Sequence, residues 1–200
     1  MILNDKDNVL GLVLSGGKST RMGADKGMIV YHDAPQREHL YTLLQQVCEK
    51  TFLSLRKDQE IGKVGNHRIL VDNDDYRGPF NGLLTAHKAH PDAAFLVLAC
   101  DLPLMDLEAL QELVAARDTS KMATAFALRE NPLPEPLCAI WEPHGLQKAI
   151  AYLEAGNGTC PRKFLINSDV HLVHPARPEV LLNANSKTEY EEAMALLAQE

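Results

Sequence analysis

Short, continuously apolar segments that never alternate cleanly with polar residues constrain the fold of this chain most strongly. Four of them lie in the first half of the sequence, at Val9–Leu14, Thr51–Leu55, Arg68–Val71 and Ala94–Ala99. Each is too short for a typical helix and rich in residues that favour strands. Strands of this kind are covered on both faces, as in parallel sheets flanked by helices. The sequence therefore predicts a buried, mostly parallel sheet.

Helical patterns separate these strands. One has apolar residues at the i, i+3, i+4 and i+7 positions of residues 40–47, with Pro35 near its start, and another follows Asp106, which is suited to cap a first turn. Alternating strands and helices predict right-handed crossovers and an α/β fold, a three-layer α/β/α sandwich around a Rossmann-like sheet. Ligands are expected at the carboxyl ends of its strands.

The second half of the chain is less regular. Met122–Ala127 and Leu137–Trp141 resemble strands around a Pro-rich loop, and Pro143–Ala155 resembles a helix that a glycine ends. Ser186 and Glu189 form a capping-box pattern before a last apolar stripe. We expect that last helix to pack onto the sheet. With no linker or repeat in view, we expect one domain over residues 1–200.

Composition excludes several classes of function. Twenty Lys and Arg against 27 Asp and Glu give a net charge of −7, so the chain lacks the positive field that nucleic-acid binding needs. No apolar run is long enough to span a membrane, and residues 1–8 do not resemble a signal peptide. We expect a cytoplasmic protein that binds neither nucleic acid nor membrane.

Cysteine and histidine spacing favours structural roles for both residue types. The four cysteines are widely separated, and Cys100 and Cys138 lie in apolar runs, where a reduced thiol behaves as a small hydrophobe. The eight histidines include no pair at zinc-binding spacing. We expect reduced cysteines and no zinc site.

The loop after the first strand has the composition of a phosphate-binding segment. Residues 14–26 read LSGGKSTRMGADK, with glycines, hydroxyls and three cations at one strand end. Glycine lets backbone amides approach an anion, and Lys and Arg neutralise phosphate charge, although a flexible turn has similar composition. The P-loop spacing is absent, because Leu12 stands where that motif needs Gly, and no G-x-G-x-x-G occurs.

This loop resembles the L-x-G-G-x-S-x-R-M-G-x-D-K signature of the molybdenum cofactor guanylyltransferases, in the nucleotidyltransferase superfamily with the nucleotide-diphospho-sugar transferase fold. The resemblance covers residues 9–106 well, which it implies are the nucleotide-binding half, and leaves 107–200 as the acceptor-binding half. It implies that the triphosphate and the developing charge are held by Arg21 and Lys26. The nucleotide contacts it implies in this loop are Leu14, Ser15, Gly16, Gly17 and Lys26.

Two acidic motifs follow in the order that the family shows. Residues 72–82 (DNDDYRGPFNG) resemble its D-x-x-x-x-G-P-x-x-G loop, where Asp72 would accept hydrogen bonds from guanine and Gly82 would allow close approach; a solvated acidic turn is the alternative. Residues 95–103 end a buried strand at Asp101, resembling the family's C-D-x-P. A strand-end carboxylate with substrate phosphates is a usual Mg²⁺ site, so we expect Mg²⁺ as cofactor and Asp101 as a catalytic and nucleotide-binding ligand.

The C-terminal motif is a weaker match. Asn183 and Asn185 keep the spacing of the family's N-x-N-T-P-E-D element, but Ser-Lys replaces Thr-Pro. The resemblance implies a metal-side role for Asn185 and an acceptor-side role for Asn183. The chain also departs from the family at Ser15, at residues 33–37, and after the second strand, where Ser54 and Arg56 stand in place of Asn-rich nucleotide contacts. Ser54 is retained as a predicted nucleotide contact.

The resemblance implies transfer of GMP from Mg²⁺-GTP to the terminal phosphate of molybdopterin or its molybdenum-loaded form, with release of pyrophosphate. The resemblance also implies other proteins of the molybdenum cofactor pathway as partners. Three alternatives stay open: a cytidylyltransferase, a nucleotidyltransferase for a sugar or polyol phosphate, and a non-catalytic carrier of the cofactor. Gly-Gly followed by Asp-Lys favours guanylyl transfer, because cytidylyl relatives more often show Ala-Ala-Gly.

Overall fold

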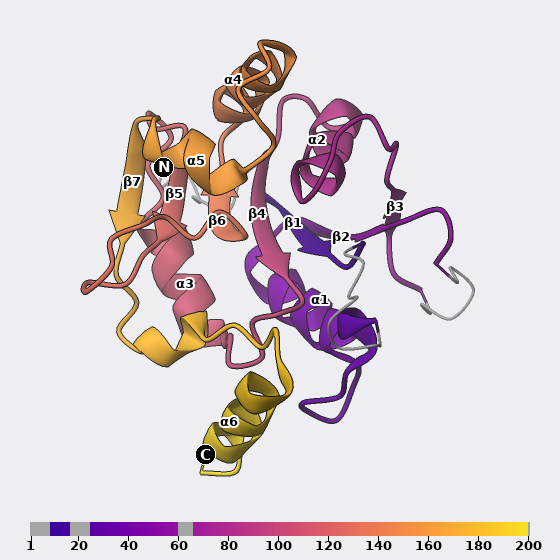
Figure 1. The fold of residues 1–200 in the computed structure, drawn as a ribbon, viewed down its shortest axis with the longest axis vertical. Helices are drawn as coiled ribbons and strands as arrows, with labels where there is room; N and C mark the ends of the chain where they lie inside the picture. Colours follow the sequence, from indigo (N-terminus) through magenta and orange to yellow (C-terminus); the bar gives the residue numbers. More distant parts are fainter. Residues whose placement is uncertain (1–8, 17–24, 60–65, 200) are drawn as a thin grey trace, which may run out of the picture.

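A seven-stranded sheet forms the centre of the computed structural model, which describes residues 9–16, 25–59 and 66–199 (Figure 1). The strand order is β3-β2-β1-β4-β6-β5-β7, and β6 alone runs against its neighbours β4 and β5. The strands are β1 (Val9–Leu14), β2 (Lys50–Leu55), β3 (Ile69–Val71), β4 (Ala94–Ala99), β5 (Ala123–Phe126), β6 (Cys138–Trp141) and β7 (Val170–Val173). The predicted mostly parallel sheet is confirmed.

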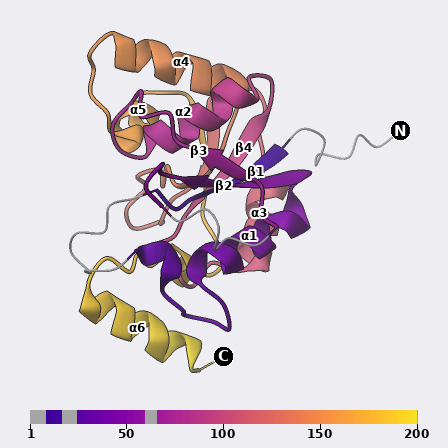
Figure 2. The same cartoon turned by 90° about the vertical axis from the view of Figure 1, so that its right-hand side faces the viewer.

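Helices cover both faces of this sheet, as the three-layer prediction requires (Figure 2). On one face lie α1 (Gln36–Val47) and α3 (Leu107–Ala115), and on the other lie α2 (Phe80–Ala89), α4 (Pro143–Glu154) and α5 (Pro161–Ile166). Side chains from alternate strand positions divide between two large apolar clusters, one under each helix layer. Cys100 and Cys138 are buried, free thiols, as expected.

The capping residues behave largely as the sequence predicts. Asp106 accepts a hydrogen bond from the amide of Ala109 at the start of α3, and Ser186 accepts one from the amide of Glu189 at the start of α6 (Lys187–Leu197). Glu189 in turn accepts from the amide of Asn185 at 2.8 Å, one residue before the cap. The cap and the helix are therefore both confirmed.

The prediction that α6 packs onto the sheet is wrong. Its buried face belongs to a separate small cluster with Tyr31, and the helix lies apart from the sheet in both ribbon views (Figures 1 and 2). The physical reason is that other helices already cover both faces of the sheet. The apolar stripe of α6 instead covers the segment after the short 3-10 helix η1 (Lys26–Met28).

Strand register brings the predicted functional segments to one edge of the sheet. Leu14 at the end of β1 pairs with Ser54 on β2 and with Ala99 on β4, and Leu55 pairs with Val71 on β3. The residues that follow these strands therefore emerge side by side. No helix in the described part of the chain is long and apolar enough to cross a membrane.

Candidate functional site

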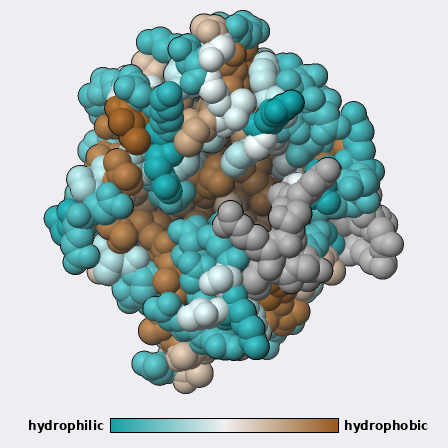
Figure 3. Space-filling model, in the orientation of Figure 1, coloured by the Kyte–Doolittle hydropathy of each residue, from teal (hydrophilic) through white to brown (hydrophobic). Residues whose placement is uncertain are grey.

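A pocket of about 680 Å³ lies at this edge of the sheet, a volume within the usual range for small-molecule sites. Its lining comes from the ends of four parallel strands, the first turn of α2, η1 and Leu137 before the reversed strand β6. Figure 3 shows a hollow on this face, where apolar surface lies among hydrophilic residues. The position agrees with the rule that open α/β sheets bind ligands beyond the carboxyl ends of their strands.

The carboxylate of Asp72 forms one end of the pocket. It is 5% exposed and accepts a hydrogen bond from the hydroxyl of Ser54 at 2.6 Å. Burial raises the pKa of Asp72, Asp74 adds to the increase, and hydrogen bonds from Ser54 and Asn81 oppose it. The carboxylate is thus held by neutral donors at the end of β3.

Two glycines make room for this carboxylate. A Cβ atom added to Gly16 would lie 2.7 Å from Oδ2 of Asp72, and one added to Gly82 would lie 2.3 Å from the hydroxyl oxygen of Ser54. Real Cβ atoms do not approach other heavy atoms so closely, so a side chain at either position would displace Asp72 or its donor. Gly16 and Gly82, one from each sequence motif, are therefore required by packing around Asp72.

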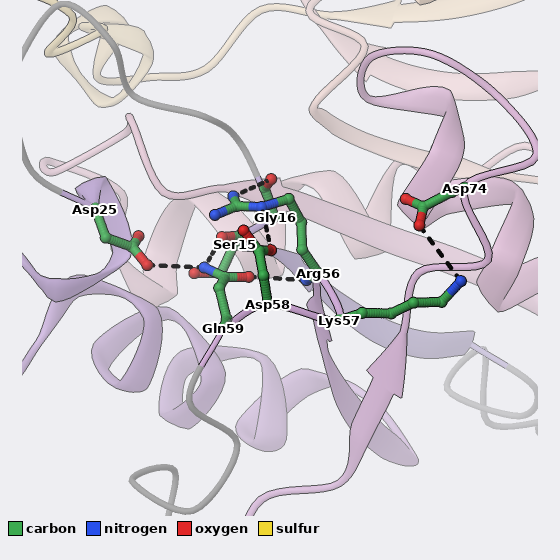
Figure 4. Close-up of polar contacts among 8 residues, drawn as sticks. All are labelled: Ser15, Gly16, Asp25, Arg56, Lys57, Asp58, Gln59 and Asp74. Atoms are coloured by element: carbon green, nitrogen blue, oxygen red, sulfur yellow. Dashed lines mark hydrogen bonds and ion pairs between the residues drawn. The ribbon is translucent and has the colours of Figure 1, made fainter.

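Gln59 links Ser15 and Asp25, which lie near the two ends of the predicted phosphate-binding segment, residues 14–26 (Figure 4). Its side-chain amide donates to the carbonyl of Ser15 at 2.9 Å and to the carboxylate of Asp25 at 2.7 Å, while its Oε1 accepts from the amide of Arg56 at 2.8 Å. Asp25 also accepts from the amide of Gly27 and so caps η1. These bonds hold the start and the end of the segment together beside β2.

The carboxyl group of Asp101 marks the other end of the pocket, directly after β4. Burial raises its pKa, Glu189 also raises it, and the positive charge of Lys26 opposes the increase. The ammonium group of Lys26 donates to Oδ1 of Asn185, and the carbonyl of Asp101 accepts from the amide of Ala184 at 2.9 Å. The 183–186 segment is thereby brought to the end of β4.

The donors at this end fit a Mg²⁺ ion that is shared with a substrate. Magnesium in nucleotide sites is usually held by one or two carboxylates, water and substrate phosphates. Asp101 supplies one carboxylate, and Asn185 supplies an amide oxygen that now accepts from Lys26. Within the described ranges no group of three or more His, Cys, Asp or Glu could hold a metal. An ion held by Asp101 and Asn185 would complete its ligands with substrate phosphates and water.

Most of the predicted site residues line this one pocket. They are Leu14, Ser15, Gly16, Lys26, Ser54, Asp72, Gly82 and Asp101. Asn185 joins them through its bond to Lys26, whereas the side chain of Asn183 donates to the carbonyl of Leu181 at 3.1 Å, in its own turn. Gly17 and Arg21 lie outside the described residues. The roles assigned to all these residues remain predictions.

Sequence reasoning missed three contributions to the site. Asp25 and Gln59 lie 34 residues apart in sequence, and a hydrogen bond joins their side chains. No local sequence pattern marks Gln59 as a site residue. The sequence predicts a loop over residues 72–82. In the structure α2 begins at Phe80, so Asn81 and Gly82 lie in its first turn. The motif spacing itself, with Pro before an apolar run, is a signal that fits a helix start.

Comparison with known proteins identifies the family. The family model described as the MobA-like NTP transferase domain matches residues 11–175. A molybdenum cofactor guanylyltransferase from Pseudomonas entomophila is 30% identical, with 86% of this chain and 95% of that protein covered. A molybdenum cofactor biosynthesis bifunctional protein from Synechocystis is 36% identical over 90% of this chain. The chain spans about half of that relative's length, 52%.

Solved structures support the same fold. Molybdopterin-guanine dinucleotide biosynthesis protein A from Archaeoglobus fulgidus has a TM-score of 0.78 at 17% identity, covering 96% of this chain and 100% of that one. A 2-C-methyl-D-erythritol 4-phosphate cytidylyltransferase from Thermus thermophilus has a TM-score of 0.66 at 13% identity, covering 94% and 98%. The fold is therefore of the nucleotide-diphospho-sugar transferase type, as the sequence predicts. Because the family model spans most of the chain and the motif residues share one pocket, this protein belongs to the MobA-like NTP transferase domain family.

Proposed function

We propose that this protein transfers GMP from GTP to the terminal phosphate of molybdopterin or its molybdenum-loaded form. An oxygen of the acceptor phosphate attacks the α-phosphorus of GTP, a new P–O–P linkage forms, and the bond to the β-phosphate breaks. Pyrophosphate leaves with the electron pair of that bond. The acceptor is already an anion, so the reaction needs no covalent enzyme intermediate and depends on positioning and charge neutralisation.

The observation that carries the proposal is the separation of a buried carboxylate, Asp72, from a partly buried one, Asp101, within one pocket. Asp72 follows β3 and Asp101 follows β4, so β2 and β1 lie between them. Three strand spacings of about 4.8 Å place the two strand ends roughly 14 Å apart. The two residues lie at opposite ends of the pocket lining, an arrangement that suits contacts to opposite ends of one nucleotide.

Each end of the pocket then has a distinct task. Asp72, held by Ser54, accepts hydrogen bonds from the guanine edge. Lys26 neutralises charge on the triphosphate and on the departing pyrophosphate, together with Arg21 from the preceding loop. Asp101, with Asn185 beside it, would hold Mg²⁺. That ion supplies charge neutralisation and alignment of the phosphate oxygens when bound.

The second half of the chain is proposed to bind the acceptor. Leu137, before β6, lines the pocket from that half, next to the Asp101 end. Asn183 is proposed to face the acceptor side, although its side chain bonds locally in this structure. The cytoplasmic location and the association with other pathway proteins remain proposals from the sequence and the resemblance.

One assay tests the class of reaction, the base and the acceptor together. The protein is incubated with Mg²⁺, each of GTP, CTP, ATP and UTP, and either molybdopterin or a sugar phosphate, and pyrophosphate is measured. We expect release only with GTP and molybdopterin. Equal release with CTP would favour the cytidylyl alternative, release with a sugar phosphate would change the acceptor class, and binding without release would indicate a carrier.

A further inference from the structure

Arg56, the residue after β2, occupies a position in the pocket that the proposed reaction leaves without a task. The sequence places it where the resembled family has nucleotide-contacting Asn residues. Its side chain lines the pocket, and 23% of that side chain is exposed. A half-enclosed guanidinium at a strand end, beside a glycine-rich segment, is therefore available to a bound nucleotide.

The guanidinium is held in a fixed orientation by two contacts (Figure 4). Nη1 donates to the carbonyl of Gly16 at 2.6 Å, and Nε donates to the carboxylate of Asp58 at 2.9 Å. The planar group has five N–H donors, so these two bonds leave three donors, two on Nη2 and one on Nη1, without a partner among the described residues. Nη2 keeps both of its donors for a ligand.

Arg56 and Asp72 flank the same strand end. A Cβ atom built on Gly16 would lie 2.7 Å from Oδ2 of Asp72 and 3.4 Å from Cγ of Arg56. The positive charge of Arg56 also lowers the pKa of Asp72 against the larger effect of burial. A donor and an acceptor of fixed position therefore stand side by side where the base is proposed to bind.

This pair is complementary to the edge of guanine. Guanine presents an acceptor at O6, next to donors at N1 and at the 2-amino group, and arginine is the usual partner of O6. We infer that Nη2 of Arg56 donates to O6 of guanine while Asp72 accepts from N1 and the 2-amino group. The inference rests on the proposed guanylyl transfer and names a second residue that determines its base specificity.

Arg56 is expected to reject bases that carry an amino group at this position. Adenine and 2,6-diaminopurine place an amino donor where guanine has O6, so two donors would face each other. Arginine cannot lose its proton in a protein, so it cannot become an acceptor to accommodate them. Mismatched polar edges are discriminated far more strongly than differences in apolar size.

The test compares GTP, ITP and 2,6-diaminopurine riboside triphosphate with wild type, Arg56→Ala and Arg56→Lys. ITP lacks only the 2-amino group, whereas the diaminopurine nucleotide keeps that group, replaces O6 by an amino group and loses the N1 proton. The N1 difference faces Asp72 in every variant, so a change in the ratio between wild type and an Arg56 variant reports the O6 position. The preference for GTP over the diaminopurine nucleotide, measured as a ratio of kcat/KM and by calorimetric binding, should fall about 10- to 100-fold in Arg56→Ala. The preference for GTP over ITP should not change, because Asp72 faces the 2-amino group.

Lys57→Ala is the matched control. Lys57 is the adjacent cation, pairs with Asp74 at the surface and does not line the pocket, so both preferences should stay at wild-type values. If Arg56→Ala and Arg56→Lys weaken all three nucleotides equally, Arg56 only positions Gly16 and the inference is overturned. Failure of the proposed function is a separate result: wild type would then release no pyrophosphate from GTP or would show no preference for it.

Discussion

The two ends of the pocket use the same type of side chain in different surroundings. Asp72 accepts from the neutral donors Ser54 and Asn81, and the positive charge of Arg56 has a smaller effect on its pKa than these hydrogen bonds. Asp101 is partly buried, and the charge that opposes the effect of its burial comes from Lys26, which itself donates to Asn185. Burial raises the pKa of both carboxyls.

This contrast shows how one fold can separate recognition from chemistry. A carboxylate fixed by neutral donors is suited to reading the edge of a neutral base, because its position is set before the ligand binds. A partly buried carboxylate opposed by a single ammonium group is suited to a cation that arrives with phosphates. Substitutions at the two ends should therefore alter different measured quantities.

The largest effect is expected at the Asp101 end. Asp101→Asn should fold but lower turnover by roughly 10³-fold, because it removes the charged ligand proposed to link the enzyme to Mg²⁺-triphosphate. Steady-state pyrophosphate release over a range of Mg²⁺ concentrations measures this. Asp106→Asn is the control, since Asp106 caps α3 outside the pocket. Turnover near that of wild type at limiting Mg²⁺ would contradict the role of Asp101.

Lys26→Ala is expected to have the next largest effect. Charge moves toward pyrophosphate during the reaction, so loss of this cation should lower kcat by about 10²–10³-fold, with a smaller change in KM for GTP. Arg21→Ala should behave alike. Lys88→Ala, which removes an exposed cation paired with Asp75, serves as control. An effect confined to KM would mean that Lys26 contributes uniform binding and no transition-state stabilisation.

A smaller and qualitatively different effect is expected at the Asp72 end. Asp72→Ala should reduce the ratio of kcat/KM for GTP over CTP by about 10²-fold and leave the dependence on Mg²⁺ unchanged. Asp75→Asn removes an exposed carboxylate outside the pocket and should preserve the ratio. If wild type uses CTP as readily as GTP, the distinction between the two ends fails and cytidylyl transfer becomes the better proposal.

The smallest expected effect concerns stability and its dependence on pH. Burial raises the pKa of Asp72 in the folded protein, so between the unfolded and folded pKa values the folded state keeps a proton that the unfolded chain has lost. The contribution of Asp72 to stability therefore falls as the pH rises through this window. Asp72→Asn should unfold at a higher temperature than wild type at neutral pH.

That stability difference should shrink when the pH is lowered below the ordinary pKa of an aspartic acid, because both states of the wild type are then protonated. Thermal unfolding followed by circular dichroism across the acid range measures it, with Asp75→Asn as the exposed control. If Asp72→Asn instead unfolds at a lower temperature than wild type at neutral pH, and this difference disappears on acidification, the prediction is wrong. The hydrogen bonds to the ionised Asp72 would then stabilise the folded state by more than burial of the charge destabilises it.

Much of the fold could be predicted because the strands are short, apolar and bounded by loops. The predicted limits of β1 and β4 agree with the structure, and Asp106 caps its helix as expected. Three elements gave no clear local signal. Eight consecutive residues of α2 are buried, so it has no amphipathic stripe; α5 has six residues, and β7 has four half-buried ones.

The residues of the candidate site also divide into those that the sequence could predict and those that only the fold reveals. Asp72 and Asp101 could be predicted because each follows an apolar strand within a spaced motif. Gln59 could not, because its importance comes from three hydrogen bonds to Ser15, Asp25 and Arg56 across the loop. Arg56 could be recognised in the sequence as a departure from the family, but its contacts with Gly16 and Asp58 are visible only in the fold.

The sequence alone determined β1 to β6 and the types of chemistry placed at their ends, because local apolar patterns report how each segment is buried. The tertiary structure decided which of these ends meet. Lys26 and Asn185 are 159 residues apart and come into contact only because the 183–186 segment returns to the end of β4. The position of α6 likewise depends on which surfaces other elements have already covered, and no local pattern encodes that competition.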